Sequence, residues 1–189
     1  VRQRDADVEV LVCDPDGRRW RTAWRYTALS RESVTPLGFG KDPNRLYVRA
    51  LHEGRQAVFE VDLADPALPR TLKLADAQRD MAGSLVVSKA TGEPVGVSGA
   101  GTAGYWDADH LAWLRAIDQR LPERVNRIVG SSRDDARYLV RSSGNGVPAE
   151  YYLGDQRNNS LALLVQSHPD LPVGELGGKR SVQVAARDG

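Results

Sequence analysis

The chain has 189 residues, with 26 Lys and Arg against 25 Asp and Glu, so its formal net charge is +1. This balance argues against nucleic acid or an anionic membrane as a partner, and no apolar run is long enough to span a bilayer. The single cysteine, Cys13, has no partner for an internal disulfide, and it leaves the compartment open among periplasmic, secreted and cytoplasmic.

Residues 1–30 are predicted to form a partial first unit, a β hairpin around the turn sequence at 14–17. Apolar and polar residues alternate in both strands, as they do in half-buried strands. One side of the second strand carries an aromatic stripe, Trp20, Thr22, Trp24 and Tyr26. We expect this stripe to pack between sheets rather than to bind peptide or sugar, and Arg21 and Arg25 on the opposite side to be solvated.

The second unit, 33–76, contains four short alternating segments separated by turn residues. The strands are expected at Thr35–Phe39, Arg45–Leu51, Ala57–Asp62 and Arg70–Leu74. Four short antiparallel strands are what one β-propeller blade requires. This unit is therefore predicted to be a complete blade.

The third unit, 81–122, is predicted to be irregular. A hairpin and a short strand are expected at Leu85–Ser88, Pro94–Ser98 and Tyr105–Trp106. Asp109–Leu121 carries an apolar stripe at helical spacing. We predict a helix there in place of the fourth strand, capped by Asp107 or Asp109 and ended by Pro122.

The fourth unit, 124–167, again shows four strand segments. They are Arg127–Ser131, Arg137–Ser142, Glu150–Gly154 and Leu161–Gln166. Residues 168–189 are expected to be an exit segment that ends with a short strand, Ser181–Ala185. The whole chain, 1–189, is treated as one domain of these units.

The second and fourth units match without a gap, 92 residues apart. Gly38, Asp42, Arg45, Val48, Arg49 and Ala57 recur as Gly130, Asp134, Arg137, Val140, Arg141 and Ala149, and Phe59 aligns with Tyr151. Half of this spacing is a typical blade length. We therefore predict an all-β, partial β-propeller of about three full four-stranded blades plus a partial one, with one helix inserted near 109–121. Because an incomplete propeller leaves sheet edges open, edge-to-edge self-association of the chain is expected.

Three groups of residues have a chemical and a structural interpretation. Gly99–Gly104 fits the dinucleotide pattern Gly-x-Gly-x-x-Gly, but Tyr105–Asp107 separates it from the helix, so a loop between strands is favoured over a cofactor site. The three histidines, His52, His110 and His168, show no metal-ligand spacing, and His168 with Ser167 and Asp170 cannot align as a triad within one loop. Cys13 is expected to be a small buried thiol. No catalytic, cofactor or metal residue is predicted.

Arg49 and Arg141 occupy the same place in the two copies of the repeat. They are the candidate peptide or channel contacts, because a guanidinium group binds carboxylates through its planar fork. The alternative is that they pair with Asp42 and Asp134 across a turn, as exposed ion pairs commonly do.

A family resemblance lies in the fourth unit and the tail. The run Pro148-Ala149-Glu150-Tyr151-Tyr152-Leu153-Gly154-Asp155 resembles the last propeller blade of prolyl oligopeptidase family serine peptidases, in the acylaminoacyl-peptidase-like branch. Arg187-Asp188-Gly189 resembles the turn that leads from the propeller into the α/β-hydrolase domain. The resemblance covers most of residues 33–189.

The resemblance implies a role without catalysis for this chain. The family's nucleophile lies in a Gly-x-Ser-x-Gly elbow, which this sequence does not contain, and its catalytic Asp and His would lie beyond Gly189. The expected function is a propeller segment that caps the hydrolase domain of the same polypeptide and filters peptide substrates. Two alternatives stay open, a peptide- or protein-binding propeller module and a small enzyme that uses Gly99–Gly104.

Overall fold

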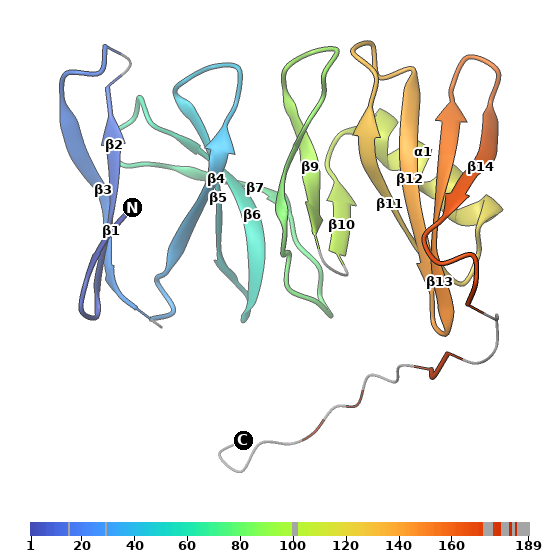
Figure 1. Ribbon diagram of the computed structural model, residues 1–189. Helices are drawn as coiled ribbons and strands as arrows, with labels where there is room; N and C mark the ends of the chain where they lie inside the picture. Colours follow the sequence, from blue (N-terminus) through green and yellow to red (C-terminus); the bar gives the residue numbers. More distant parts are fainter. Residues whose placement is uncertain are drawn as a thin grey trace. The chain divides into compact units, whose positions relative to one another are not determined.

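The computed structural model describes residues 1–14, 16–28, 30–99, 102–171, 176–178, 182 and 184, and it is mostly β with one helix (Figure 1). The chain divides into two compact units, Val1–Ala112 and Trp113–Gly189, and each is described by itself. The predicted all-β architecture of successive propeller-type antiparallel sheets with one inserted helix is confirmed. No helix in the described ranges is long and apolar enough to cross a membrane.

The first unit contains three antiparallel sheets. β1 (Arg2–Arg4), β2 (Asp7–Cys13) and β3 (Trp20–Thr27) form the first, with the order β1-β2-β3. β4 (Val34–Phe39), β5 (Arg45–His52), β6 (Arg55–Asp62) and β7 (Arg70–Leu74) form the second, in chain order. β8 (Ser84–Val87), β9 (Pro94–Gly99) and β10 (Thr102–Tyr105) form the third, with the order β10-β9-β8. The second sheet has the strands that the sequence predicts. In the third sheet, β10 lies at Thr102–Tyr105 instead of the predicted Tyr105–Trp106, because residues of the expected glycine-rich loop pair with β9. β1 was not predicted.

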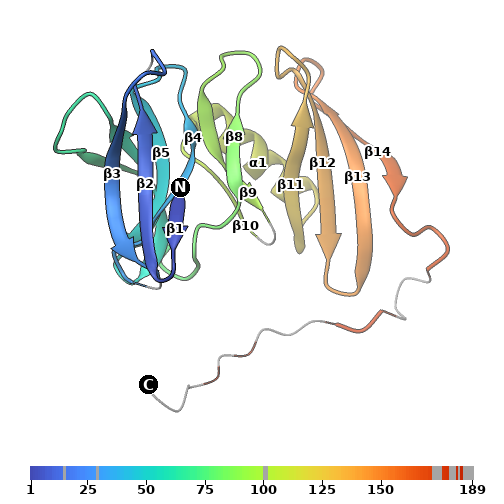
Figure 2. The ribbon, with the colours of Figure 1, turned by 60° about the vertical axis from the view of Figure 1, so that its left-hand side comes forward.

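The β4–β7 sheet is covered on both faces within the first unit, as Figure 2 shows. Alternate residues of β5 and β6, such as Val48 and Phe59, pack against Val12 and Trp24 of the first sheet. The intervening residues of β5 and β6, such as Tyr47, face the third sheet. The ring of Tyr47 stacks there on the ring of Trp106, which follows β10, with centroids 5.3 Å apart. Because side chains alternate across a strand, two buried faces require apolar residues at consecutive positions, and β5 and β6 have them.

A bulge in β3 corrects the prediction of a single aromatic stripe. Val10 lies opposite Trp24, but Leu11 lies opposite Thr22, so Ala23 is an extra residue in β3. An extra residue reverses the faces of the residues beyond it. Trp24 and Tyr26 therefore pack into the core, whereas Trp20 is turned to the other face and is 65% exposed. Arg21, predicted to be solvated, donates instead to the Leu63 carbonyl oxygen at 2.5 Å.

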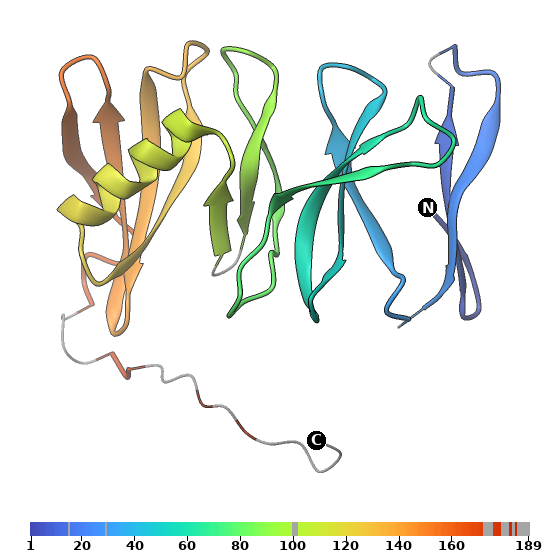
Figure 3. The same ribbon diagram turned by 180° about the vertical axis from the view of Figure 1, so that it is seen from behind.

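The second unit contains one four-stranded sheet and most of the helix. β11 (Arg124–Ser131), β12 (Arg137–Gly144), β13 (Val147–Asp155) and β14 (Ser160–Gln166) pair in chain order, as predicted. α1 (Ala108–Arg120) starts at the cap Asp107, whose carboxylate accepts from the His110 amide at 3.0 Å. Its apolar stripe lies on the sheet, where Ile117 contacts Tyr138 and Val140 (Figure 3).

The sequence repeat is reproduced strand by strand in the β4–β7 and β11–β14 sheets. Each first strand has a bulge before a glycine, at Gly38 and at Gly130. Each central hairpin closes through a two-residue turn whose glycine, Gly54 or Gly146, has a positive φ. Glu53 also has a positive φ, so the first of these turns has the two left-handed residues of a type I′ turn, which matches the twist of the strands that it joins.

One feature distinguishes the two copies. The register between β12 and β13 shifts between Ser142 and Gly144, and the register between β5 and β6 does not shift. Val48 lies opposite Phe59, but Val140 lies opposite Tyr152. In the second copy, the place of Phe59 is therefore taken by Tyr152, and the gap-free alignment of Phe59 with Tyr151 is wrong by one residue.

The predicted exit segment falls largely on residues that the structure does not describe. Of the expected strand Ser181–Ala185, only Val182 and Val184 belong to the described residues, and Arg187-Asp188-Gly189 lies outside them.

Candidate functional site

Arg49 connects two sheets of the first unit. It lies on β5 opposite Thr35 and Val58, and its Nη1 is 3.5 Å from the carbonyl oxygens of both Met81 and Gly83. These two residues lead into β8, so the guanidinium group reaches the backbone at the entry of the next sheet.

Arg141 has a different environment on β12. It lies opposite Arg127 on one side and Tyr151 on the other, and its Nη1 donates to Ser143 Oγ at 3.3 Å. Two guanidinium side chains at directly opposed positions repel each other unless an anion lies between them or solvent separates them. Arg127 and Arg141 thus lie side by side on the same face of the sheet.

The aspartates of the repeat pair with other arginines than the sequence suggests. Asp42 Oδ2 lies 3.8 Å from Arg45 Nε, and Asp134 Oδ2 lies 2.5 Å from Arg157 Nη2. The expected alternative, in which they pair with Arg49 and Arg141, is therefore not what these aspartates do.

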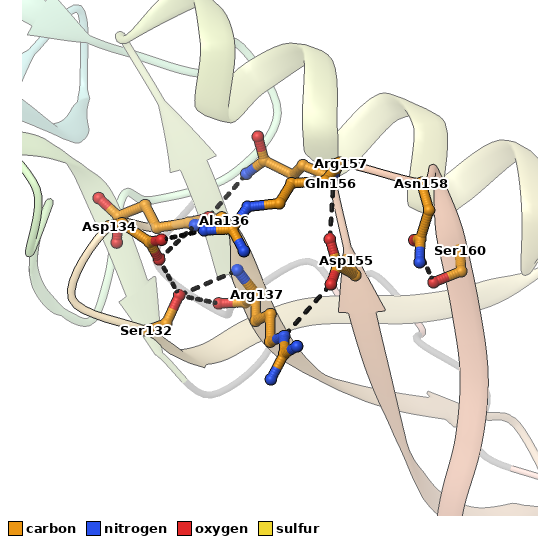
Figure 4. A network of polar contacts seen from close by, with 10 residues as sticks. Ser132, Asp134, Ala136, Arg137, Asp155, Gln156, Arg157, Asn158 and Ser160 are labelled. Carbon is orange, nitrogen blue, oxygen red and sulfur yellow. Dashed lines mark hydrogen bonds and ion pairs between the residues drawn. The ribbon is translucent and has the colours of Figure 1, made fainter.

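A polar network joins two turns at one end of the β11–β14 sheet (Figure 4). Asp134 accepts from Ser132 Oγ at 2.6 Å and from the Ala136 amide at 3.2 Å, and these hydrogen bonds hold the pKa of its carboxyl below the usual range. Arg137 Nε donates to Asp155 Oδ2 at 3.2 Å and so connects this turn to the turn before β14.

The β4–β7 sheet contains a related network at the equivalent residues, without the serine hydroxyl, since Gly40 takes the place of Ser132. Asp42 accepts from the Asn44 amide at 2.8 Å, and Arg45 Nη1 lies 3.1 Å from Asp62 Oδ2. The Leu63 amide donates to the Asn44 carbonyl oxygen as the Gln156 amide donates to that of Ala136, at 2.8 and 2.9 Å. Asp42 and Asp134, with Arg45 and Arg137, therefore stabilise the turns of their own sheets.

A row of polar residues crosses the helix-covered face of the β11–β14 sheet. In register across the four strands it consists of Asn126, Ser142, Glu150 and Gln166. The equivalent row in the β4–β7 sheet is Val34, Ala50 and Ala57, all buried and apolar. The register shift of β13 places Glu150, rather than Ala149, opposite Ser142.

Glu150 is the centre of this buried row. Arg124 forms an ion pair with it, Tyr152 Oη donates to Oε2 at 2.7 Å, and Gln166 Nε2 donates to Oε1 at 2.9 Å. Burial alone would raise the pKa of Glu150, but these hydrogen bonds and the charge of Arg124 outweigh it, so the pKa lies below the usual value. Each carboxylate oxygen has a donor, which makes Glu150 a structural anion rather than a proton-transfer group.

Two oxygen atoms of the row have no hydrogen-bond partner within the described chain. They are Ser142 Oγ and Asn126 Oδ1, both buried. The amide nitrogen of Asn126 donates to Asp118 Oδ1 and to the Leu121 carbonyl oxygen, which ties the row to α1. Sequence reasoning missed this cluster, because a Glu in a strand is normally placed on a solvated face.

The residue groups singled out in the sequence are dispersed in the structure. Gly99 pairs with Thr102 in the antiparallel β9–β10 hairpin, and α1 begins only at Ala108, so the glycine-rich run has no helix N-terminus for a pyrophosphate; residues 100 and 101 lie outside the described ranges. Cys13 is partly exposed at the end of β2, rather than buried as expected.

The three histidines lie in unrelated surroundings. His52 contacts the ring of Phe59 edge-on, His110 Nδ1 lies 2.7 Å from Asp107 Oδ1, and His168 is in an exposed turn. Among the residues that the structure describes, no three His, Cys, Asp or Glu side chains gather in a group that could hold a metal ion.

The fold of the chain is similar to that of a solved structure, whereas its sequence matches no known family. No family model matches the chain, and no curated protein matches it in sequence. Among solved structures, the chain is similar to TolB from Acinetobacter baumannii, with a TM-score of 0.41 and 11% sequence identity. The match covers 85% of this chain and 41% of the TolB chain, so this chain spans less than half the length of that protein.

Proposed function

We propose that this chain is a non-catalytic β-propeller segment of a prolyl oligopeptidase family serine peptidase, where it caps the hydrolase domain and filters peptide substrates. The observation that supports the proposal most is the position of the resembling segment. Pro148–Asp155 lies in β13, the third strand of the last four-stranded sheet, and the chain leaves that sheet through β14. A terminal blade of the family would carry the segment in this place.

The partners in this proposal are an α/β-hydrolase domain of the same polypeptide and short peptides. Arg141, opposite Arg127, would meet a peptide carboxylate. Arg49 would contribute less, because its guanidinium group already reaches the carbonyl oxygens of Met81 and Gly83.

The test is the coding sequence that follows Gly189, together with labelling by a serine-directed fluorophosphonate probe. We expect a Gly-x-Ser-x-Gly elbow downstream, labelling of the longer polypeptide at that serine, and no labelling of the present chain. A stop codon directly after Gly189, or labelling of the present chain, would contradict the proposal.

A second candidate is a peptide- or protein-binding module without a peptidase domain. The exposed apolar residues at the outer side of the β11–β14 sheet favour it, since Leu153, Leu164 and Val165 are 44%, 60% and 53% exposed. An open reading frame that ends without a hydrolase domain would select this candidate over the first.

A further inference from the structure

β14 is an edge strand with an unusual surface. Its only strand partner among the described residues is β13, so its other side presents unpaired backbone N–H and C=O groups. Its sequence, Ser-Leu-Ala-Leu-Leu-Val-Gln, contains neither a charged residue nor a proline. Leu163, Leu164 and Val165 are each more than half exposed. Exposed apolar edges of this kind pair with other strands.

The repeat shows what protects the equivalent edge in the first unit. Both outer strands carry a bulge, at Lys73 in β7 and at Leu164 in β14. Lys73 Nζ lies 3.4 Å from Glu60 Oε2, and the residue equivalent to Glu60 in β13 is Leu153. An ion pair at the edge of one sheet is thus replaced by two leucines at the edge of the other. A lysine on an edge strand opposes pairing with another chain.

We propose that β14 binds β14 of a second copy of this chain, antiparallel and centred on Leu163, so that two β11–β14 sheets join into one continuous sheet. In a two-fold antiparallel pair each strand faces an identical strand, so a charged strand would bring like charges together. β14 has no charged residue and therefore meets no such repulsion. This inference does not rest on the proposed peptidase function.

The other sheet edges are less suited to this pairing. β1 carries Arg2 and Arg4, and β3 carries Arg21 and Arg25. β7 carries Arg70 and Lys73, and β11 carries Arg124 and Arg127. β4 contains Pro36, which has no N–H to donate. β8 and β10 have four residues each, against seven in β14.

Cysteine cross-linking tests the pairing and its register. In a Cys13→Ser background, Leu163→Cys places two thiols opposite each other across the two-fold axis, at a separation that a disulfide can bridge. The matched control is Leu72→Cys, at the equivalent position of β7, opposite Phe59 as Leu163 is opposite Tyr152. We expect mild oxidation to give a covalent dimer with Leu163→Cys and none with Leu72→Cys. No dimer from Leu163→Cys, or equal dimer from both, would overturn the proposal.

Leu164→Lys gives β14 the residue that β7 has at its bulge. Light scattering coupled to size exclusion is expected to show a dimer for the unaltered chain and a dissociation constant at least about tenfold higher for Leu164→Lys. Val165→Lys is the second variant, and circular dichroism checks that both remain folded. The proposal would be refuted if the unaltered chain is monomeric at its highest soluble concentration, or if the folded lysine variants dimerise with the same dissociation constant as the unaltered chain.

Discussion

The β4–β7 and β11–β14 sheets share strands, bulges and turns, yet they differ in what their faces meet. The first is covered on both faces by neighbouring sheets of its unit, and the second is covered on one face by α1. The residues that repeat, such as Asp42 with Asp134 and Arg45 with Arg137, serve the turns of their own sheet. The residues that do not repeat, such as Ala57 against Glu150, depend on the surroundings of each copy.

The largest expected effect concerns a cross-strand pair whose two side chains differ in size between the copies. Leu46 lies opposite Val61 in the first copy, and Tyr138 lies opposite Gly154 in the second. A Cβ on Gly154 would overlap the Tyr138 ring. Gly154→Val is therefore expected to lower the free energy of unfolding by about 3 kcal/mol, as an overpacked core does, measured by urea denaturation.

The double variant Gly154→Val with Tyr138→Leu recreates the pair of the first copy. We expect it to recover more than half of the lost stability, because the smaller leucine leaves room for the valine. A double variant no more stable than Gly154→Val alone would show that the size exchange is not what relates the two pairs.

The second effect concerns the buried ion pair that replaces an apolar row. Arg124→Ala leaves the Glu150 carboxylate buried without its cation, and we expect a loss of about 2 kcal/mol in the free energy of unfolding. Because the pKa of Glu150 is lowered in the folded chain from its ordinary value of 4.5, its contribution is complete above that pH and is lost as the pH falls through the folded pKa.

The urea midpoint measured from about pH 7 to about pH 3 tests this second effect. Glu150→Gln is the control, since an amide keeps the shape and removes the titration, and its profile should be flatter at the acidic end. Equal acid sensitivity of Glu150→Gln and the unaltered chain would mean that other carboxyls determine the profile.

The smallest effect tests the likeness of the copies. Arg45→Ala and Arg137→Ala each remove the link between two turns, and each is expected to cost about 0.5 kcal/mol, as partly exposed ion pairs do. Thermal unfolding at low and high salt measures both, and high salt should reduce the two losses equally. A loss several times larger in one copy would show that the two networks are not equivalent.

Much of the fold could be predicted because its signals are local. Turn residues and alternation located the strands of both repeat copies, and the apolar stripe with Asp107 located α1 within a residue at each end. The bulge at Ala23 and the shift near Ser142 could not be predicted, since strand pairing rather than local sequence determines register. β1 was missed because Arg2–Arg4 is polar throughout and has no alternation.

The candidate sites were less predictable than the strands. Alignment located Arg49 and Arg141 at equivalent places, but it could not show that β8 follows one of them and that Arg127 lies beside the other. From the sequence alone, Glu150 is expected on the solvated face of its strand. The register shift of β13 by one residue places it opposite Ser142 on the buried face. The signal that could have indicated Leu164 is the comparison of outer strands, where one copy has charges and the other has none.

The arginine that joins two turns in each copy has a consequence for engineering. Arg137 and Asp155 are cross-strand partners, and both belong to the sheet that they close. The same holds for Arg45 and Asp62. Each of these ion pairs therefore joins two turns through residues of one sheet alone. When such a sheet is transplanted to another array of sheets, we expect this ion pair to be kept and the residues on the sheet faces to be the ones that need redesign.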